Sequence, residues 1–429
     1  MGLHHLLSRH VLHVGFTVAA TLSPFALTSV AQATPTTTTS LAPGTEATVA
    51  PLPLNTGVTG GEVSAISCTA PGQCVAGGVE YLRATVQHAV LSTETNGIWG
   101  KAQVVGMSAP AVGSSVFVEH VVCPRMGACV ALGQVDSTSI ASSGAQFSSF
   151  LVVQHGSNWN KAQVIPTTGL GVHPSYLLTA MACEKAGSCV MAGTLLVNGT
   201  ADRVFSLTWH NGRWSAPSFL SGAALGARAK LMSLAALSCV GSWCEGIGLY
   251  TTALSTSAST GHNIGPYGVT YSGGRWHTMH SLGAYRASTN VSLLGTISCT
   301  SVGTCVAGGE SDATKGNGST AVATEERSGH WSALYALPSK GANTLETVSC
   351  TSASACTGII THTGGNFAGV VTMSASRHWN VSTPASTPGW SSLQGWAMSC
   401  VARQCTIVGS GTQTAAGSSL PVVITPSAG

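Results

Sequence analysis

The sequence predicts an all-β protein, a seven-bladed β-propeller with one hairpin disulfide in each blade. Two observations predict this fold. The 429-residue chain has 14 cysteines, and all of them fall in close Cys-x5-Cys or Cys-x4-Cys pairs that recur every 50–60 residues. Each repeat also carries alternating strands separated by Gly-rich turns. A repeat of this length cannot bury a core alone, which indicates stacked units in a solenoid or propeller. Four strands per repeat in seven repeats favour the propeller.

Residues 1–33 read as a secretory signal peptide. Arg9 precedes an apolar run from Val11 to Val30, and Ala31-Gln32-Ala33 supplies a small-x-small cleavage site. An uncleaved N-terminal anchor is the alternative, because the apolar run is nearly long enough to span a bilayer. Pro24 within the run and the cleavage site favour removal. We expect a secreted, extracellular protein with no integral membrane span after cleavage.

The rest of the chain divides into a lead-in and the propeller. Residues 34–46 are rich in Thr, Pro and Ser and predict a flexible lead-in, and residues 47–429 form the repeats. In each repeat a strand ends at the first cysteine, a short turn follows, and the second cysteine opens a second strand. A variable polar loop, a third strand and a Gly-containing turn then lead to a tryptophan that opens the fourth strand. This turn and tryptophan occupy residues 96–99, 156–159, 211–214, 273–276, 328–331 and 376–379.

The seventh repeat lacks this tryptophan, because the chain ends soon after its third strand at residues 420–424. A sheet left with an open edge invites edge-to-edge pairing. Residues 47–52 precede the first blade as fourth strands precede the others. We therefore predict that the N-terminal segment supplies the missing strand and closes the ring.

An even number of cysteines in close pairs, in an exported chain, predicts disulfides. Zinc is the alternative, but zinc sites favour Cys-x2-Cys spacing and two pairs converging on one ion. The expected bonds are Cys68–Cys74, Cys123–Cys129, Cys183–Cys189, Cys239–Cys244, Cys299–Cys305, Cys350–Cys356 and Cys400–Cys405. Two residues before the first cysteine, apolar side chains recur that should pack between blades: Ile66, Val121, Met181, Leu237, Ile297, Val348 and Met398.

Charged residues make up only 7% of the chain and the net charge is +3, whereas globular domains typically contain about 25% charged residues. Neither nucleic acid nor an anionic membrane is an implied partner. With few carboxylates that must stay ionised, little stability should be lost as the pH falls. This suits an acidic habitat, and it equally suits an ordinary secreted β-protein rich in Gly, Ser and Thr.

The Ser-Cys-x5-Cys-x-Ala-x-Gly hairpins and Gly-x-Trp turns resemble those of repeat-bearing exported proteins of actinobacteria and related soil bacteria, described as sialidase-like or Asp-box propellers. The resemblance covers about residues 45–429 and implies a propeller, but it carries no chemistry. The nearest approach to the S-x-D-x-G-x-x-W box is residues 92–99, with Glu94 in place of Asp and a displaced Gly. Sialidases also need an arginine cluster, a Tyr/Glu nucleophile and an Asp acid. This chain has three aspartates, Asp136, Asp202 and Asp312, and no convincing set.

Aligning the repeats on their first cysteine identifies one inner-strand position, four residues upstream, that should face the mouth of the central channel. The residues there are Ser64, Glu119, Thr179, Ala235, Gly295, Glu346 and Trp396. Glu119 and Glu346 are the candidate catalytic pair, because two carboxylates across a pocket can serve glycoside hydrolysis. His120 and Trp396 are candidate ligand-binding residues. The alternative is a wet channel with two solvated carboxylates and a space-filling His120.

A second candidate set lies at the ends of second strands, where the chain enters the variable loops: Glu80, Asp136, Glu310 and His362. Loops on a rigid scaffold commonly carry binding specificity, although these polar loops could simply be hydrated. The chain has no His-Glu-x-x-His, Gly-x-Ser-x-Gly, Walker or haem-attachment motif. We expect neither a metal nor a cofactor.

These patterns favour a monomeric, exported, non-enzymatic binding or surface-interaction module that presents its loops to a glycan or protein ligand. A glycoside hydrolase of sialidase-like descent is the alternative. A purely structural envelope protein is a third possibility.

Overall fold

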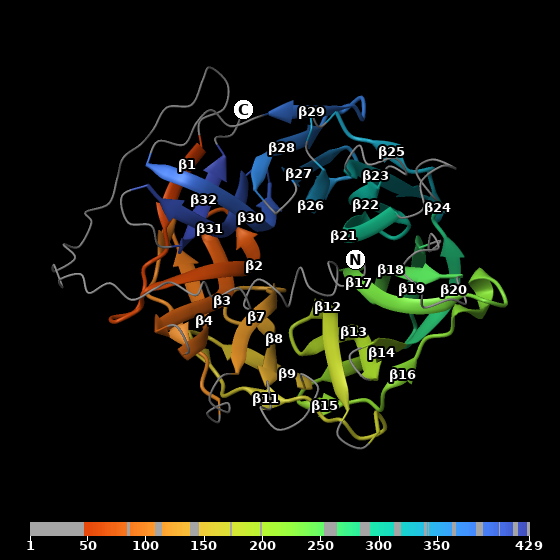
Figure 1. The fold of residues 1–429 in the computed structure, drawn as a ribbon, viewed down its shortest axis with the longest axis horizontal. Coiled ribbons are helices and arrows are strands. Elements are labelled where there is room, and N and C mark those ends of the chain that lie inside the picture. Colours follow the sequence, from red (N-terminus) through yellow and green to blue (C-terminus); the bar gives the residue numbers. More distant parts are fainter. Residues whose placement is uncertain are drawn as a thin grey trace, which may run out of the picture.

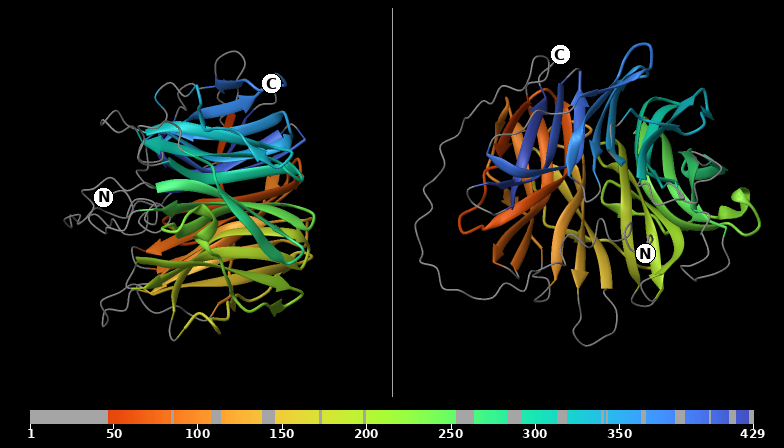
Figure 2. Two further views of the ribbon diagram at one scale, coloured as in Figure 1. Left: turned by 90° about the vertical axis from the view of Figure 1, so that its right-hand side faces the viewer. Right: turned by 45° about the horizontal axis from the view of Figure 1, so that its top comes forward.

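Seven antiparallel sheets surround a central axis in the computed structural model, so the predicted seven-bladed β-propeller is confirmed (Figure 1). Figure 2 shows the ring of blades from the side and obliquely. The structure describes residues 47–83, 86–107, 114–137, 146–171, 174–197, 200–252, 264–283, 292–312, 319–338, 341, 343–362, 366–382, 389–402, 404–414 and 419–426. The expected signal peptide and lead-in lie outside these residues.

The strands follow one another blade by blade along the chain. Blade 1 contains β2 (Gly60–Ala70), β3 (Gln73–Arg83), β4 (Val86–Thr95), β5 (Ile98–Trp99) and β6 (Gln103–Val104). Blade 2 contains β7 (Ser115–Val122), β8 (Val130–Ser137), β9 (Gln146–His155), β10 (Asn158–Trp159) and β11 (Gln163–Val164). Blade 3 contains β12 (Ser175–Lys185), β13 (Ser188–Val197), β14 (Thr200–His210), β15 (Arg213–Trp214) and β16 (Ser218–Phe219). Blade 4 contains β17 (Lys230–Val240), β18 (Trp243–Thr251), β19 (Ile264–Ser272) and β20 (Arg275–Ser281).

The remaining blades complete the circle. Blade 5 contains β21 (Ser292–Ser301), β22 (Thr304–Asp312), β23 (Ser319–Arg327), β24 (His330–Trp331) and β25 (Tyr335–Ala336). Blade 6 contains β26 (Thr344–Ser352), β27 (Ala355–Thr361), β28 (Phe367–Met373) and β29 (Trp379–Ser382). Blade 7 contains β30 (Trp390–Val401), β31 (Gln404–Gln413), β32 (Ser419–Pro426) and the N-terminal β1 (Ala47–Pro51). A short 3-10 helix, η2 (Gly222–Leu225), precedes β17. Within the described ranges, no helix is long and apolar enough to span a membrane.

The N-terminal strand closes the ring as predicted. β1 pairs antiparallel with β32, from Ala47 opposite Pro426 to Pro51 opposite Val422. β1 thus covers the edge of β32, and the two ends of the described chain are held in one blade (Figure 1).

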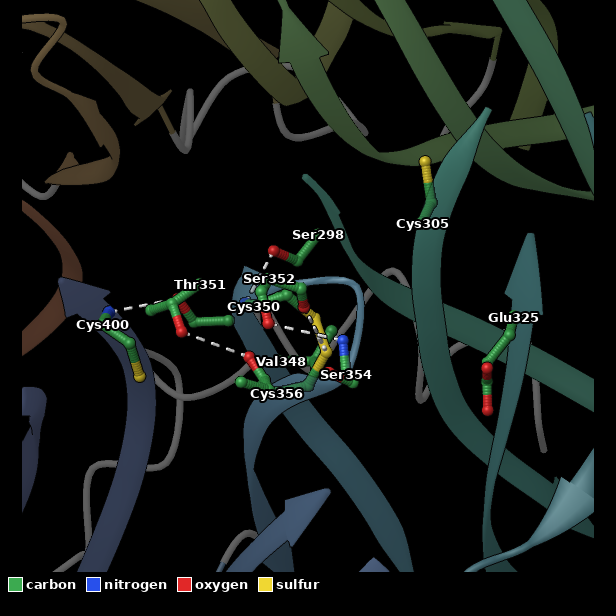
Figure 3. The surroundings of a disulfide bond; sticks show 12 residues. Ser298, Cys305, Glu325, Val348, Cys350, Thr351, Ser352, Ser354, Cys356 and Cys400 are labelled. Carbon is green, nitrogen blue, oxygen red and sulfur yellow. Dashed lines mark hydrogen bonds between the residues drawn. A yellow bond between two sulfur atoms is a disulfide. The ribbon is translucent and has the colours of Figure 1, made fainter. Parts of the chain in front are cut away.

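All seven predicted disulfides are present, and each joins the first two strands of its blade. The paired Cα atoms lie 3.9–4.0 Å apart, because the cysteines face each other across a tight hairpin. Figure 3 shows the bond between Cys350 and Cys356 with its surroundings. Each short loop contributes roughly 2 kcal/mol by chain entropy.

The serine before the first cysteine links neighbouring blades. Its Oγ accepts a hydrogen bond of 2.9–3.1 Å from the backbone N–H of the next blade's cysteine. The bonds run from Cys123 to Ser67, Cys299 to Ser238, Cys350 to Ser298, Cys400 to Ser349 and Cys68 to Ser399. The other two junctions have Val122 and Ala182, which carry no hydroxyl group. The bond from Cys68 to Ser399 ties the last blade to the first.

Apolar contacts between blades form the core. Ile66 of blade 1 shares a buried cluster with Val408 and Val423 of blade 7. Met181 of blade 3 likewise packs with the buried residues Leu132 and Leu151 of blade 2. The apolar residues two positions before the cysteines therefore pack between blades, as expected.

The fourth-strand tryptophans reach back to the preceding blade. Trp276 Nε1 donates to Ser206 Oγ of blade 3 at 2.7 Å, and Trp379 Nε1 donates to Tyr335 Oη of blade 5 at 3.0 Å. The turns before them follow the hairpin rule, as in blade 1, where Asn96 and Gly97 have φ of 53° and 80°. The tryptophans of four other blades also pack against clusters that include residues of the preceding blade: Trp99, Trp159, Trp214 and Trp331.

Candidate functional site: the central channel

The innermost strand of every blade has a β-bulge at the same position. In β2, for example, the pairing with β3 shifts between Val63 and Ala65, which leaves Ser64 without a cross-strand partner. The residues skipped in this way are Ser64, Glu119, Thr179, Ala235, Gly295, Glu346 and Trp396. These are the seven residues that the sequence placed at the channel mouth. A bulge redirects a side chain and is common beside functional sites.

The bulges surround a pocket on the axis of the propeller with a volume of about 380 Å³. Each blade contributes the bulge residue and the two residues after it to the wall. The second residue after each bulge belongs to a ring of apolar side chains that includes Ile66, Met181 and Met398, so this part of the pocket wall is hydrophobic. The volume falls in the range of small-molecule sites, about 300–1,000 Å³.

The seven bulge residues differ in side-chain chemistry from blade to blade. Ser64 Oγ donates to Val118 O of the next blade at 2.5 Å, and Thr179 Oγ1 donates to Leu234 O of the next blade at 2.7 Å. These two hydroxyl groups join blades. Blades 4 and 5 carry only Ala235 and Gly295 at this position, and a Cβ on Gly295 would meet no atom within 4 Å.

Glu119 is the most deeply buried of the predicted site residues that line the pocket, with 7% of its surface exposed. Gln134 Nε2 donates to Glu119 Oε2, and the same amide donates to Leu178 O of blade 3 at 3.3 Å. Burial raises the pKa of Glu119 to about 8, while the bond from Gln134 opposes this rise. Glu119 is therefore mainly protonated at neutral pH.

The other three members of the first candidate set also line the pocket. Glu346 is half-buried, and its Oε2 accepts a 3.3 Å hydrogen bond from Thr361 Oγ1. Half-buried Trp396 lies in blade 7, and half-buried His120 follows Glu119 in blade 2. The structure thus brings Glu119, His120, Glu346 and Trp396 into one cavity, as the repeat alignment predicted.

The second candidate set does not assemble into one site. Only Glu310 enters the pocket, where its Oε2 accepts from Thr344 Oγ1 at 2.7 Å. Glu80 lies outside the pocket wall and accepts hydrogen bonds from the backbone N–H and Nδ2 of Asn55, in the segment that joins β1 to β2.

The two remaining members of that set lie at strand ends outside the pocket wall. Asp136 is half-buried near the end of β8, and burial raises its pKa. His362 is exposed after β27, with Nδ1 3.2 Å from Gly341 O.

Glu62 is a pocket residue that the sequence reasoning missed. It lies two residues before the bulge at Ser64 and lines the cavity. Burial raises its pKa to about 7, while a hydrogen bond with Tyr81 opposes the rise. The alignment considered only one position per repeat. The alternation of a strand, which places every second residue on one face, would have found Glu62.

The part of the chain that the structure describes contains no group of three His, Cys, Asp or Glu side chains arranged to hold a metal ion. The described side chains of the pocket offer an indole face, hydroxyl groups, one imidazole and several carboxyl groups.

Comparisons with known proteins establish only the fold of this chain. No protein-family model matches the sequence, and no curated protein matches it. An ulvan lyase of polysaccharide lyase family PL25 superposes with a TM-score of 0.50 at 8% identity, covering 82% of this chain and 92% of the lyase. A protein of unknown function from Dyadobacter fermentans gives 0.49 at 9% identity, over 90% of this chain and all of that one. Trypanosoma rangeli sialidase in complex with sialic acid gives 0.43 at 10% identity, over 90% and 59%. The likeness to the lyase establishes a shared propeller fold.

Proposed function

We propose that the protein is an exported, non-enzymatic binding module that takes a small glycan into its central channel. The observation that carries this proposal is the ring of seven bulges around a pocket of about 380 Å³. Ligand sites combine apolar and aromatic walls with a few convergent polar groups. Trp396 offers an aromatic face, and Glu119 and Glu346 offer hydrogen-bonding groups to sugar hydroxyls.

Two features of the scaffold support the proposed location and state. Seven disulfides are typical of proteins from oxidising compartments, which favours export. Ring closure by β1 covers the sheet edge that would otherwise pair with a second copy, which favours a monomer.

The test is binding to a panel of oligosaccharides by the wild type and Trp396→Ala. Loss of an aromatic contact costs about 1.4 kcal/mol, so we expect about tenfold weaker binding. Val164→Ala is the matched control, because Val164 is 76% exposed on the outer strand β11. Equal binding by wild type and Trp396→Ala would show that the ligand does not bind in the channel and would overturn the proposal.

Glycoside hydrolysis is the second candidate function. It is favoured by Glu119, because a buried carboxyl group that stays protonated at neutral pH has the property of a general acid. Against it, the described residues of the pocket wall include no arginine and no aspartate. If a hydrolase screen detects activity, Glu119→Gln and Glu346→Gln test it separately. Activity that survives both substitutions would locate the chemistry outside the channel.

A further inference from the structure

The described wall of the pocket is rich in carboxyl groups. Glu62, Glu119, Glu310 and Glu346 line it from blades 1, 2, 5 and 6. Among the described residues of the wall, His120 is the one basic side chain, and no lysine or arginine occurs there. A ligand that enters therefore meets carboxyl groups on several sides.

Glu119 also has an unused oxygen atom. Gln134 occupies Oε2, but Oε1 receives no hydrogen bond from any residue that the structure describes. The side chain is more than nine-tenths buried and forms part of the pocket wall. Because Glu119 lines the pocket, this oxygen can accept a hydrogen bond from a donor on a ligand.

We infer that the pocket selects a ligand bearing an ammonium group, an amino sugar with a free amine, over neutral and acidic sugars. The inference rests on the proposed glycan-binding function and specifies its ligand class. An ammonium group is a donor without acceptor capacity and matches the free oxygen of Glu119 once this carboxyl group has lost its proton. A uronate or sialic acid would bring its own negative charge to a wall whose described residues include several carboxyl groups and no lysine or arginine.

Binding of such a cation should release protons. A positive charge beside a carboxyl group favours its ionised form. Glu119 and Glu62, whose pKa values are raised by burial, would each lose a proton more readily in the complex. The other titratable groups that face them are Tyr81, His120, Glu310 and Glu346.

The experiment compares a glucosamine disaccharide with its N-acetylated counterpart and a galacturonate disaccharide at neutral pH. Because a hydrogen bond to a charged group contributes about 1.5–3 kcal/mol, we expect the free amine to bind at least about tenfold more tightly than the N-acetylated sugar. Calorimetry in two buffers of different ionisation enthalpy measures proton release. Glu119→Gln should abolish the preference for the amine and reduce the proton release. The exposed Glu184→Gln, at the end of β12, is the matched control.

The outcomes separate this inference from the proposed function. Equal binding of the amine and the N-acetylated sugar, or preference for the galacturonate, overturns the inference and leaves a glycan-binding channel, provided that Trp396→Ala weakens the binding. A preference for the amine that persists in Glu119→Gln also overturns it. Binding that Trp396→Ala does not affect, or no binding to any of the three sugars or to the wider panel, overturns both.

Discussion

Two carboxyl groups are buried together between blades 4 and 5, away from the channel. Glu245 in β18 is 0% exposed and Glu326 in β23 is 3% exposed. Thr270 Oγ1 donates to Glu245 Oε2 at 2.7 Å, but the buried Glu245 Oε1 and Glu326 Oε2 receive no hydrogen bond from described residues. Burial raises the pKa of Glu245 to about 8, and the nearby Glu326 adds to the rise. Burial also raises the pKa of Glu326 to about 7.

These pKa changes predict a protein that is more stable in mild acid than at alkaline pH. In the unfolded chain the carboxyl group of Glu245 ionises near 4.5, whereas in the folded protein it stays protonated until about pH 8. Its contribution to stability is therefore fully present below the unfolded pKa and is lost as the pH rises toward 8. Each pKa unit corresponds to about 1.4 kcal/mol, so the loss is at most on the order of 5 kcal/mol.

The perturbation that isolates this effect is Glu245→Gln, which keeps the acceptor for Thr270 and removes the ionisable proton. We expect the variant to gain stability relative to the wild type as the pH rises, by roughly 2–5 kcal/mol between about pH 4.5 and 8.5. His280, whose pKa is lowered by burial, is present in both proteins. The exposed Glu184→Gln serves as the control.

The assay is guanidinium denaturation without reductant, followed by tryptophan fluorescence across this pH range. Parallel pH profiles for the wild type and Glu245→Gln would refute the reasoning. They would mean that Glu245 is already ionised in the folded protein at neutral pH, or that water reaches it.

Three other changes test the architecture. Ser399→Ala removes the hydrogen bond from Cys68 and should cost about 1 kcal/mol of stability, with no effect on disulfide formation; an unchanged denaturation midpoint would show that this bond contributes nothing. Deleting Ala47–Pro51 exposes the edge of β32 and should lower the melting temperature and produce concentration-dependent oligomers, which light scattering would detect; a monomer with the wild-type melting curve would contradict the closure. Trp276→Phe removes the hydrogen bond to Ser206 and should lower the free energy of unfolding by about 1 kcal/mol. If Trp276→Phe lowers it equally in a protein that already carries Ser206→Ala, the cost comes from packing alone.

Much of the candidate site could be predicted because the repeat is regular. Counting back from the first cysteine identified all seven bulge residues, since each blade copies one backbone path. Counting from the second cysteine also separates Glu80 from Glu310: Glu80 lies six residues after Cys74 and Glu310 five residues after Cys305, and neighbouring positions of a strand point to opposite faces. Glu80 faces Asn55 of the N-terminal segment, whereas Glu310 faces Thr344 of the next blade. Only the identity of these two partners depends on residues that are distant in sequence.

The sequence by itself determined the number of blades, the disulfide pairs and the closing strand. These features depend on local spacing and on alternation along single strands, and both can be read from the order of the residues. Only the tertiary structure decided which polar groups are buried together. The approach of Glu326 to Glu245, and the convergence of Glu62 and Glu119 on one pocket, depend on how twisted blades meet around the axis. Burial then sets the pKa of each carboxyl group, because the cost of desolvation depends on everything that surrounds the group and not on its sequence neighbours.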